Sequence, residues 1–254
     1  MEIIKENYFD NDELKIYRGK DFEVSKYITI HQPTLDEICD FGEKKYYQTI
    51  YNFVATPQSM KAQLWTEWGI DYMDLTPYQL FYNLIIQLMD NKNTSIIFGD
   101  LDFSKFVPLK KESNDVCLCQ VINGELVEFD EYTYNLVVDY ICKTHFIERD
   151  LKIPANNSTK RFLIEDAIDE MNRNKNIEYH SNLKNLISAM INCEGFKYNH
   201  SQVWGMKINA FMDSVKRIGK IKNANLLLQS GYSGFGINLK EINKKQLDWL
   251  GELD

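Results

Sequence analysis

Two aspartates separated by one residue form the most reactive-looking motif of the chain. Asp100 and Asp102 lie in Phe98-Gly99-Asp100-Leu101-Asp102-Phe103-Ser104, after a short apolar segment. Paired carboxylates at a strand end can hold Mg²⁺, and one of them can attack phosphorus. That chemistry usually occupies a doubly wound sheet, whereas the residues that follow here predict a hairpin and helices. We therefore interpret the motif as a solvated turn.

Cysteine and histidine offer a second route to chemistry. Cys117 and Cys119 point to one face of an expected strand, but they lack the two-residue spacing and the second ligand pair of a zinc site. We expect buried structural cysteines, no metal and no cofactor. The histidines are far apart and form no known metal or hydrolase motif, although folding could still bring a Cys–His pair together: His31, His145, His180 and His200. The sequence predicts no catalytic residue, and hence no enzyme.

Two segments of the C-terminal third could bind phosphate. The glycine-rich run 231–236 lacks the Gly-Lys-Ser/Thr ending of a phosphate loop, and no strand precedes it, so we expect a turn. Four cations form the only basic cluster and are the candidate anion contacts: Lys216, Arg217, Lys220 and Lys222. We favour a solvated helix face for them, because the chain as a whole is acidic.

Large aromatic side chains are the candidates for binding a partner. Aromatic residues make up 13% of the chain. They are the preferred anchors of protein interfaces, but they also fill protein cores, and for the tryptophans both alternatives stay open. The candidate partner-binding residues are Trp65, Trp68, Tyr232, Phe235 and Trp249.

Composition narrows the class of protein. The chain has 254 residues and a net charge of −8. Residues 1–154 hold 15 basic and 26 acidic side chains, and this acidic part should repel nucleic acid and anionic membranes. Five scattered cysteines favour a reducing compartment. The first residues contain no apolar signal segment, and no apolar run approaches the roughly 20 residues that span a bilayer. We expect a cytoplasmic protein.

The elements that position these residues follow from periodicity and turn signals. Short strands are predicted at 14–17 and 27–30, and another at 95–98. Asn123-Gly124 predicts a hairpin of 116–122 with 125–129, because these residue types supply the positive φ angles of a type I′ turn. Thr56-Pro57 and Thr76-Pro77 each predict a helix start, and Asp130 another. Further helices are predicted near 34–42, 43–55, 159–174, 181–193, 199–219, 223–230 and 240–250.

These elements predict an α+β, predominantly helical protein. Residues 152–158 have the composition of a linker. We expect a mixed N-terminal domain with β-hairpins over residues 1–153 and a helical domain over 154–254.

Several phrases of the sequence resemble a known group of proteins. They are Pro33 to Ile38, Phe41 to Tyr46, Leu64-Trp65 with Gly69 to Tyr72, and Leu239 to Lys245 with Leu247 to Leu250. Together they resemble tail-morphogenesis proteins of tailed bacteriophages and prophages of low-GC Gram-positive bacteria, often described as tail assembly chaperones. The resemblance spans residues 14–253 and brings no catalytic residue with it.

The resemblance implies a protein-binding factor in phage tail assembly, with the tape-measure or tail-tube protein as partner. Such a chaperone would act in the cytoplasm of the bacterial host. Two alternatives stay open: a structural subunit of the tail or baseplate, which would remain in the virion, and a nucleic-acid-binding regulator that uses the basic region 216–222. The oligomeric state is left undetermined.

Overall fold

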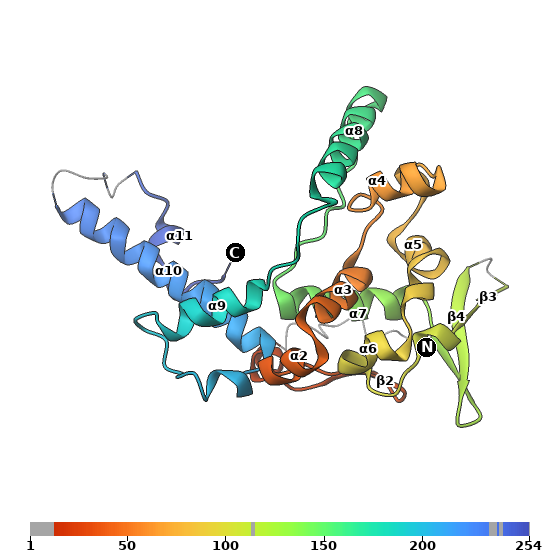
Figure 1. The fold of residues 1–254 in the computed structure, drawn as a ribbon, viewed down its shortest axis with the longest axis horizontal. Helices are drawn as coiled ribbons and strands as arrows, with labels where there is room; N and C mark the ends of the chain where they lie inside the picture. The colour runs from red at the N-terminus through yellow and green to blue at the C-terminus, as the bar shows by residue number, and fades with distance from the viewer. Residues whose placement is uncertain (1–12, 113–114, 234–237, 239–240, 254) are drawn as a thin grey trace. The chain divides into compact units, whose positions relative to one another are not determined.

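The protein forms two compact units, which we describe separately. The computed structural model describes residues 13–112, 115–233, 238 and 241–253 (Figure 1). The larger unit comprises residues 20–33 and 37–181, and the smaller unit comprises 13–19, 34–36 and the described residues from 182 onward. As the sequence predicts, the fold is α+β and predominantly helical, with two small sheets in the larger unit. Separate folding of 1–153 and 154–254 stays a prediction.

The first hairpin of the larger unit joins β1 (Phe22–Ser25) and β2 (Ile28–Ile30). The predicted strand at 14–17 is wrong, because these residues lie in α1 (Glu13–Arg18) of the smaller unit. A four-residue apolar pattern fits a strand or a helix equally well. Gly19 follows α1 with a φ of +75°, which favours glycine.

The second sheet contains three antiparallel strands, and its hairpin turn confirms the sequence-based prediction. Its order is β3 (Val107–Lys110), β4 (Val116–Ile122) and β5 (Glu125–Phe129). Asn123 and Gly124 have φ angles of 51° and 83°, as a type I′ turn requires. This turn pairs Ile122 with Glu125 and sets the register of every residue behind it.

Helices make up most of the rest of the larger unit. They include α2 (Leu35–Phe41), α3 (Glu43–Val54), α5 (Pro77–Asn83) and α7 (Glu131–His145), and α7 contacts β5. The capping box at Thr76 is confirmed: its Oγ1 accepts from Gln79 N at 3.1 Å, and Gln79 Oε1 accepts from Thr76 N at 2.8 Å. The short helical turns η2 (Tyr72–Asp74) and η3 (Ile85–Leu88) lie before and after α5, and η4 (Phe103–Lys105) precedes β3.

The predicted strand at 95–98 is also wrong. These residues end α6 (Asn91–Phe98), which starts where Asp90 Oδ1 accepts a hydrogen bond from Asn93 N at 2.9 Å. The β-branched and aromatic residues of this stretch favour a strand locally. The helix forms instead because Asp90 caps its N-terminus and because Ile97 and Phe98 are buried in this conformation.

A cluster of aromatic rings forms the core of the larger unit. Phe103 is fully buried, and its ring centroid lies 4.8–5.5 Å from those of four other phenylalanines: Phe53, Phe98, Phe106 and Phe129. These residues come from α3, α6, η4 and β5 and the loop after η4, so one cluster joins the helices to the sheet.

Two further helices of the larger unit pack on each other (Figure 1). The helix predicted to start at Thr56-Pro57 begins later, at α4 (Lys61–Gln63), because Thr56 forms a turn with Ser59. It continues as the π-helical turn η1 (Leu64–Trp68), which Gly69 ends in a left-handed conformation. Its neighbour α8 (Asn157–Asn174) begins at the capping residue Asn156.

The smaller unit consists of helices. They are α1, α9 (Asn182–Ile191), η5 (Val203–Gly205), α10 (Ile208–Tyr232) and α11 (Lys244–Leu247). The division predicted between 199–219 and 223–230 is wrong, since α10 is continuous through Gly219 and buries Ala224. Ile208 and Phe211 are fully buried. Among the described residues, no helix is both long and apolar enough to cross a bilayer.

Candidate functional site

The strongest candidate for a binding surface is a pair of exposed tryptophans on η1. Leu64 anchors this turn in the core with no exposed surface, whereas Trp65 and Trp68 are 50% and 43% exposed. The two indoles lie three residues apart within this turn, and each leaves about half of its surface in solvent. Both tryptophans were sequence-based candidates, and both are exposed in the structure.

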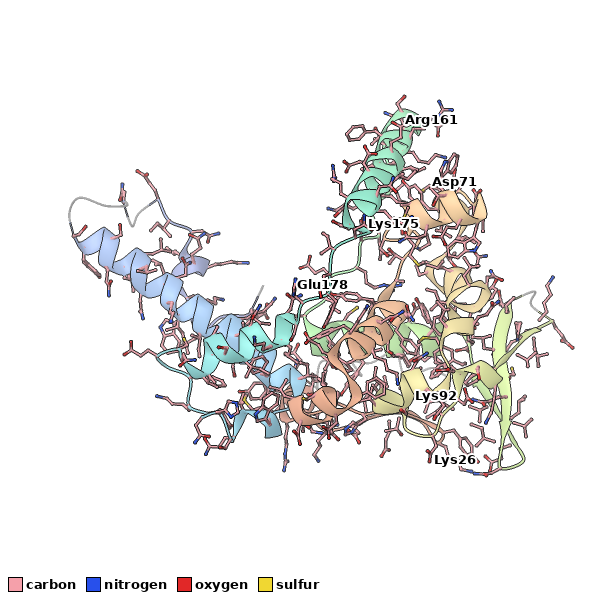
Figure 2. The ribbon with its side chains drawn as sticks, viewed as in Figure 1. Lys26, Asp71, Lys92, Arg161, Lys175 and Glu178 are labelled. Atoms are coloured by element: carbon pink, nitrogen blue, oxygen red, sulfur yellow. The ribbon has the colours of Figure 1, made fainter. Side chains whose placement is uncertain are left out.

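An ion pair holds the segment that follows these tryptophans against α8. Asp71 and Lys160 form it, and Asp71 lies beside α8 in Figure 2. Partial burial acts to raise the pKa of Asp71, but hydrogen bonds from Lys160 and from Met73 N outweigh it and lower the pKa. No local sequence pattern indicates this contact, since the two residues are 89 positions apart.

A hollow of about 640 Å³ lies between α4 and α8. Polar and charged side chains dominate its lining, among them Gln63, Glu67 and Glu170. Neither Trp65 nor Trp68 lines it, so the exposed tryptophans form a surface distinct from this hollow.

The other aromatic candidates belong to the smaller unit. Tyr232 ends α10 and is 81% exposed, and Trp249 is 46% exposed after α11. Phe235 lies outside the described residues. Trp249 and Tyr232 therefore add exposed aromatic surface, but in the unit that does not contain Trp65 and Trp68.

Part of the basic cluster bonds to the protein's own backbone. Arg217 donates to the carbonyl oxygens of Trp249 and Gly251, both at 2.7 Å, and Lys220 donates to that of Glu252. The side chain of Cys193 raises the pKa of Lys222. A hollow of about 390 Å³ is lined by Lys216 and Lys220 among others. Arg217 and Lys220 thus hold the C-terminal segment 249–252 against α10.

The Asp100–Asp102 motif has a structural role. Asp102 caps η4, and its Oδ1 accepts from Ser104 N at 3.1 Å and from Ser104 Oγ at 2.7 Å. These bonds, the hydroxyl one foremost, lower the pKa of Asp102. The apolar residues of the motif, Leu101 and Phe103, are buried. The motif therefore positions core side chains.

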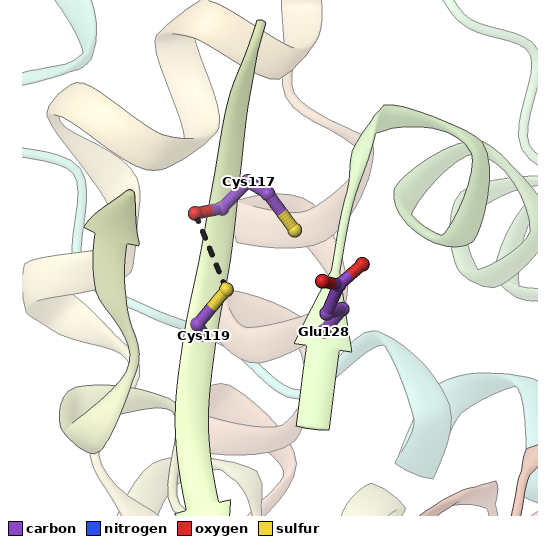
Figure 3. Close-up of side chains that lie close together, drawn as sticks. All are labelled: Cys117, Cys119 and Glu128. Atoms are coloured by element: carbon purple, nitrogen blue, oxygen red, sulfur yellow. Dashed lines mark hydrogen bonds between the residues drawn. The ribbon is translucent and has the colours of Figure 1, made fainter. Parts of the chain in front are cut away.

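The two cysteines of β4 are buried, as expected, but they have a third neighbour that the sequence-based reasoning missed. Cys119 lies directly opposite Glu128 of β5. The donor atoms of Cys117, Cys119 and Glu128 all lie within 4.8 Å of one another. Figure 3 shows the Cys117 sulfur pointing towards the Glu128 carboxylate. The sequence alone could have predicted that Glu128 lies beside Cys119, because a two-residue turn at 123–124 pairs residue 119 with residue 128.

Burial keeps the Cys117 thiol uncharged. It raises the pKa of Cys117 to about 12, and the neighbouring Cys119 contributes to the shift. The thiolate is the nucleophilic form, so this cysteine is not activated for covalent catalysis.

Two histidines make contacts that the sequence did not predict. His145 accepts at Nε2 from the Tyr46 hydroxyl at 2.6 Å and contacts the Ile141 carbonyl through Nδ1 at 2.8 Å, which fits a neutral ring. Burial lowers its pKa to about 4. His31 lies between Asp21 and Glu37, at 2.8 and 3.2 Å. The contacts described for the two rings join them to tyrosine, carbonyl and carboxylate oxygens, not to a cysteine.

A comparison with known families gives a match in the C-terminal part of the chain. Residues 172–254 match the family model described as the YomV second domain, a phage-type family. The match covers α9 to α11 and no complete element of the larger unit. No curated protein and no solved structure matches the chain. The similarity supports the phage or prophage character that the sequence phrases suggest.

Proposed function

We propose that this protein binds another protein during the assembly of phage tails, as a chaperone for the tape-measure protein. The phage-type domain match over residues 172–254 supports the phage context. The paired exposure of Trp65 and Trp68 carries the binding role. Tryptophan is enriched among the residues that dominate interface energies. Single exposed apolar residues are common on protein surfaces, but two indoles on one turn form a ready anchor.

The geometry suits recognition of an apolar helix. A tape-measure protein is expected to expose apolar side chains at helical spacing until tube subunits cover them. Indoles three residues apart can insert between such side chains, as in helix-in-groove recognition. The chaperone would then leave when the tail-tube protein takes its place.

The direct experiment is co-expression with the tape-measure protein of the same phage, and separately with its tail-tube protein. We expect co-purification that is lost in the double variant Trp65→Ala/Trp68→Ala. Tyr132→Ala is the matched control, because Tyr132 is also half exposed in the larger unit but lies on α7. Equal recovery of the partner by the double variant would refute this binding surface.

Analysis of purified virions separates a chaperone from a tail subunit. A chaperone leaves before the particle is complete, so we expect the protein in infected cells and not in virions. Its presence in virions at the copy number of a tail component would favour a structural subunit instead.

A further inference from the structure

The cysteine pair of β4 is the place where side chains with metal-binding chemistry gather outside the proposed binding surface. Cys117 and Cys119 are 1% and 5% exposed. Among the described residues, theirs is the one group of at least three cysteine, histidine or acidic side chains close enough to share a metal ion. Glu128 completes it from the neighbouring strand.

The sheet presents these three donors on one face. Cys117 and Cys119 are two residues apart in β4, and Glu128 is the cross-strand partner of Cys119. Donor separations within 4.8 Å are near those of a tetrahedral site, where sulfurs at the usual 2.3 Å bond length lie about 3.8 Å apart. Small rotations about the side-chain bonds would therefore close the site without moving the strands.

The surroundings suit a soft cation with a net-neutral ligand set. Val107 and Leu109 of β3 lie opposite Cys119 and Cys117, so apolar side chains flank the sulfurs. Lys111 donates to Glu128 Oε2 at 2.8 Å, which orients the carboxylate as outer hydrogen bonds do around metal ligands. Two thiolates, one carboxylate, one lysine and one divalent cation sum to zero charge.

We propose that Cys117, Cys119 and Glu128 bind Zn²⁺, with the fourth position left to water or to a group of a partner protein. The cation replaces the two thiol protons, which leave to solvent, and no electron is transferred. Two thiolates select a thiophilic ion over Mg²⁺ or Ca²⁺. An open fourth position distinguishes this arrangement from a closed structural zinc site. The inference does not depend on the proposed binding function.

The test is a Co²⁺ titration of the whole, reduced and chelator-treated protein, followed by displacement with Zn²⁺. We expect one Co²⁺ per chain, a sulfur-to-cobalt charge-transfer band and the visible bands of tetrahedral cobalt. Zn²⁺ should remove these bands and raise the melting temperature.

Three variants assign the site. Cys117→Ser should abolish most of the charge-transfer band. Glu128→Gln, at an exposed position where folding is not at risk, should keep a weakened band and lower Co²⁺ affinity about tenfold or more. Cys39→Ser, which removes an exposed thiol elsewhere, should leave the titration unchanged. Absence of saturable binding, or a Co²⁺ affinity that Glu128→Gln and Cys117→Ser leave intact, would overturn the proposal.

Discussion

Lys160 of α8 forms an ion pair with Asp71, the residue that caps η2 shortly after Trp65 and Trp68. Both side chains are about three-quarters buried, at 22% and 24% exposure. One contact thus connects the orientation of α8 with the segment that ends the exposed tryptophan turn.

Breaking this pair should destabilise the larger unit. Asp71→Asn keeps an acceptor for Met73 N but leaves the partly buried Lys160 ammonium uncompensated, so we expect a loss of about 1 kcal/mol in the free energy of unfolding. The loss should be present at neutral pH. It should vanish as pH falls below 3.8, because the lowered pKa of Asp71 stabilises the fold only while the carboxylate is ionised.

The control is an exposed ion pair of the same unit. Lys26 and Glu125 lie 2.6 Å apart but are 66% and 56% exposed (Figure 2 labels Lys26). Glu125→Gln should therefore leave the free energy of unfolding almost unchanged, because solvent screens an exposed pair. Equal effects of the two substitutions in chemical denaturation would contradict a special role for Asp71.

The Asp100–Asp102 segment should matter for folding rather than for chemistry. Phe103→Ala would empty a fully buried position among four other rings, and we expect a cost of about 3–5 kcal/mol. Asp100→Asn, at an exposed position of the same segment, should change stability by less than about 0.5 kcal/mol. Hydrolysis of phosphate esters that requires Mg²⁺ and is lost in Asp100→Asn would instead show that the segment has a catalytic role.

Local signals in the sequence predicted the elements that local chemistry controls. Thr76-Pro77 and Asn123-Gly124 succeeded because a cap and a turn depend on residues three or fewer positions apart. The strands predicted at 14–17 and 95–98 failed because short apolar runs fit both periodicities, and burial elsewhere in the fold decides between them.

The candidate site was predictable only in part. The exposure of Trp65 and Trp68 could not be read from the sequence, since tryptophan occurs both in cores and at interfaces. The contact of Lys160 with Asp71 joins distant segments, and no local pattern reports it. The position of Glu128 could have been predicted, because the register of the hairpin places it beside Cys119.

Acid should weaken the fold through His145. Its pKa of about 4 lies below the ordinary 6.5, so the unfolded chain binds the proton more readily between these values. Stability should therefore decline by about 3 kcal/mol as pH falls from 6.5 to 4, and no further below that. The native protein should have a higher free energy of unfolding than His145→Asn near neutral pH. This difference should shrink as the pH falls from 6.5 to 4. A stability difference between the two proteins that does not vary with pH would refute a neutral, half-buried His145.

The segment after Asp150 should be the first site of proteolysis. Arg149 and Asp150 are tied to the end of α3, since Arg149 Nε donates to Val54 O at 3.1 Å and Thr56 Oγ1 donates to Asp150 O at 2.8 Å. Residues 151–158 are largely exposed. Trypsin should cut after Lys152 before it cuts after Arg149, and Lys152→Gln should delay that cut. Cleavage after Arg149 before cleavage after Lys152 would contradict this order. It would also contradict the prediction that residues 152–158 form an exposed linker.

The most direct test of the central claim is the dissociation constant for the tape-measure protein of the same phage. We predict that Trp65→Ala/Trp68→Ala weakens binding by about a hundredfold or more, as the loss of two anchor side chains should, while the melting temperature changes little. Tyr132→Ala should bind as the native protein does. Native affinity in the tryptophan double variant, or no measurable binding by the native protein, would contradict the proposed function.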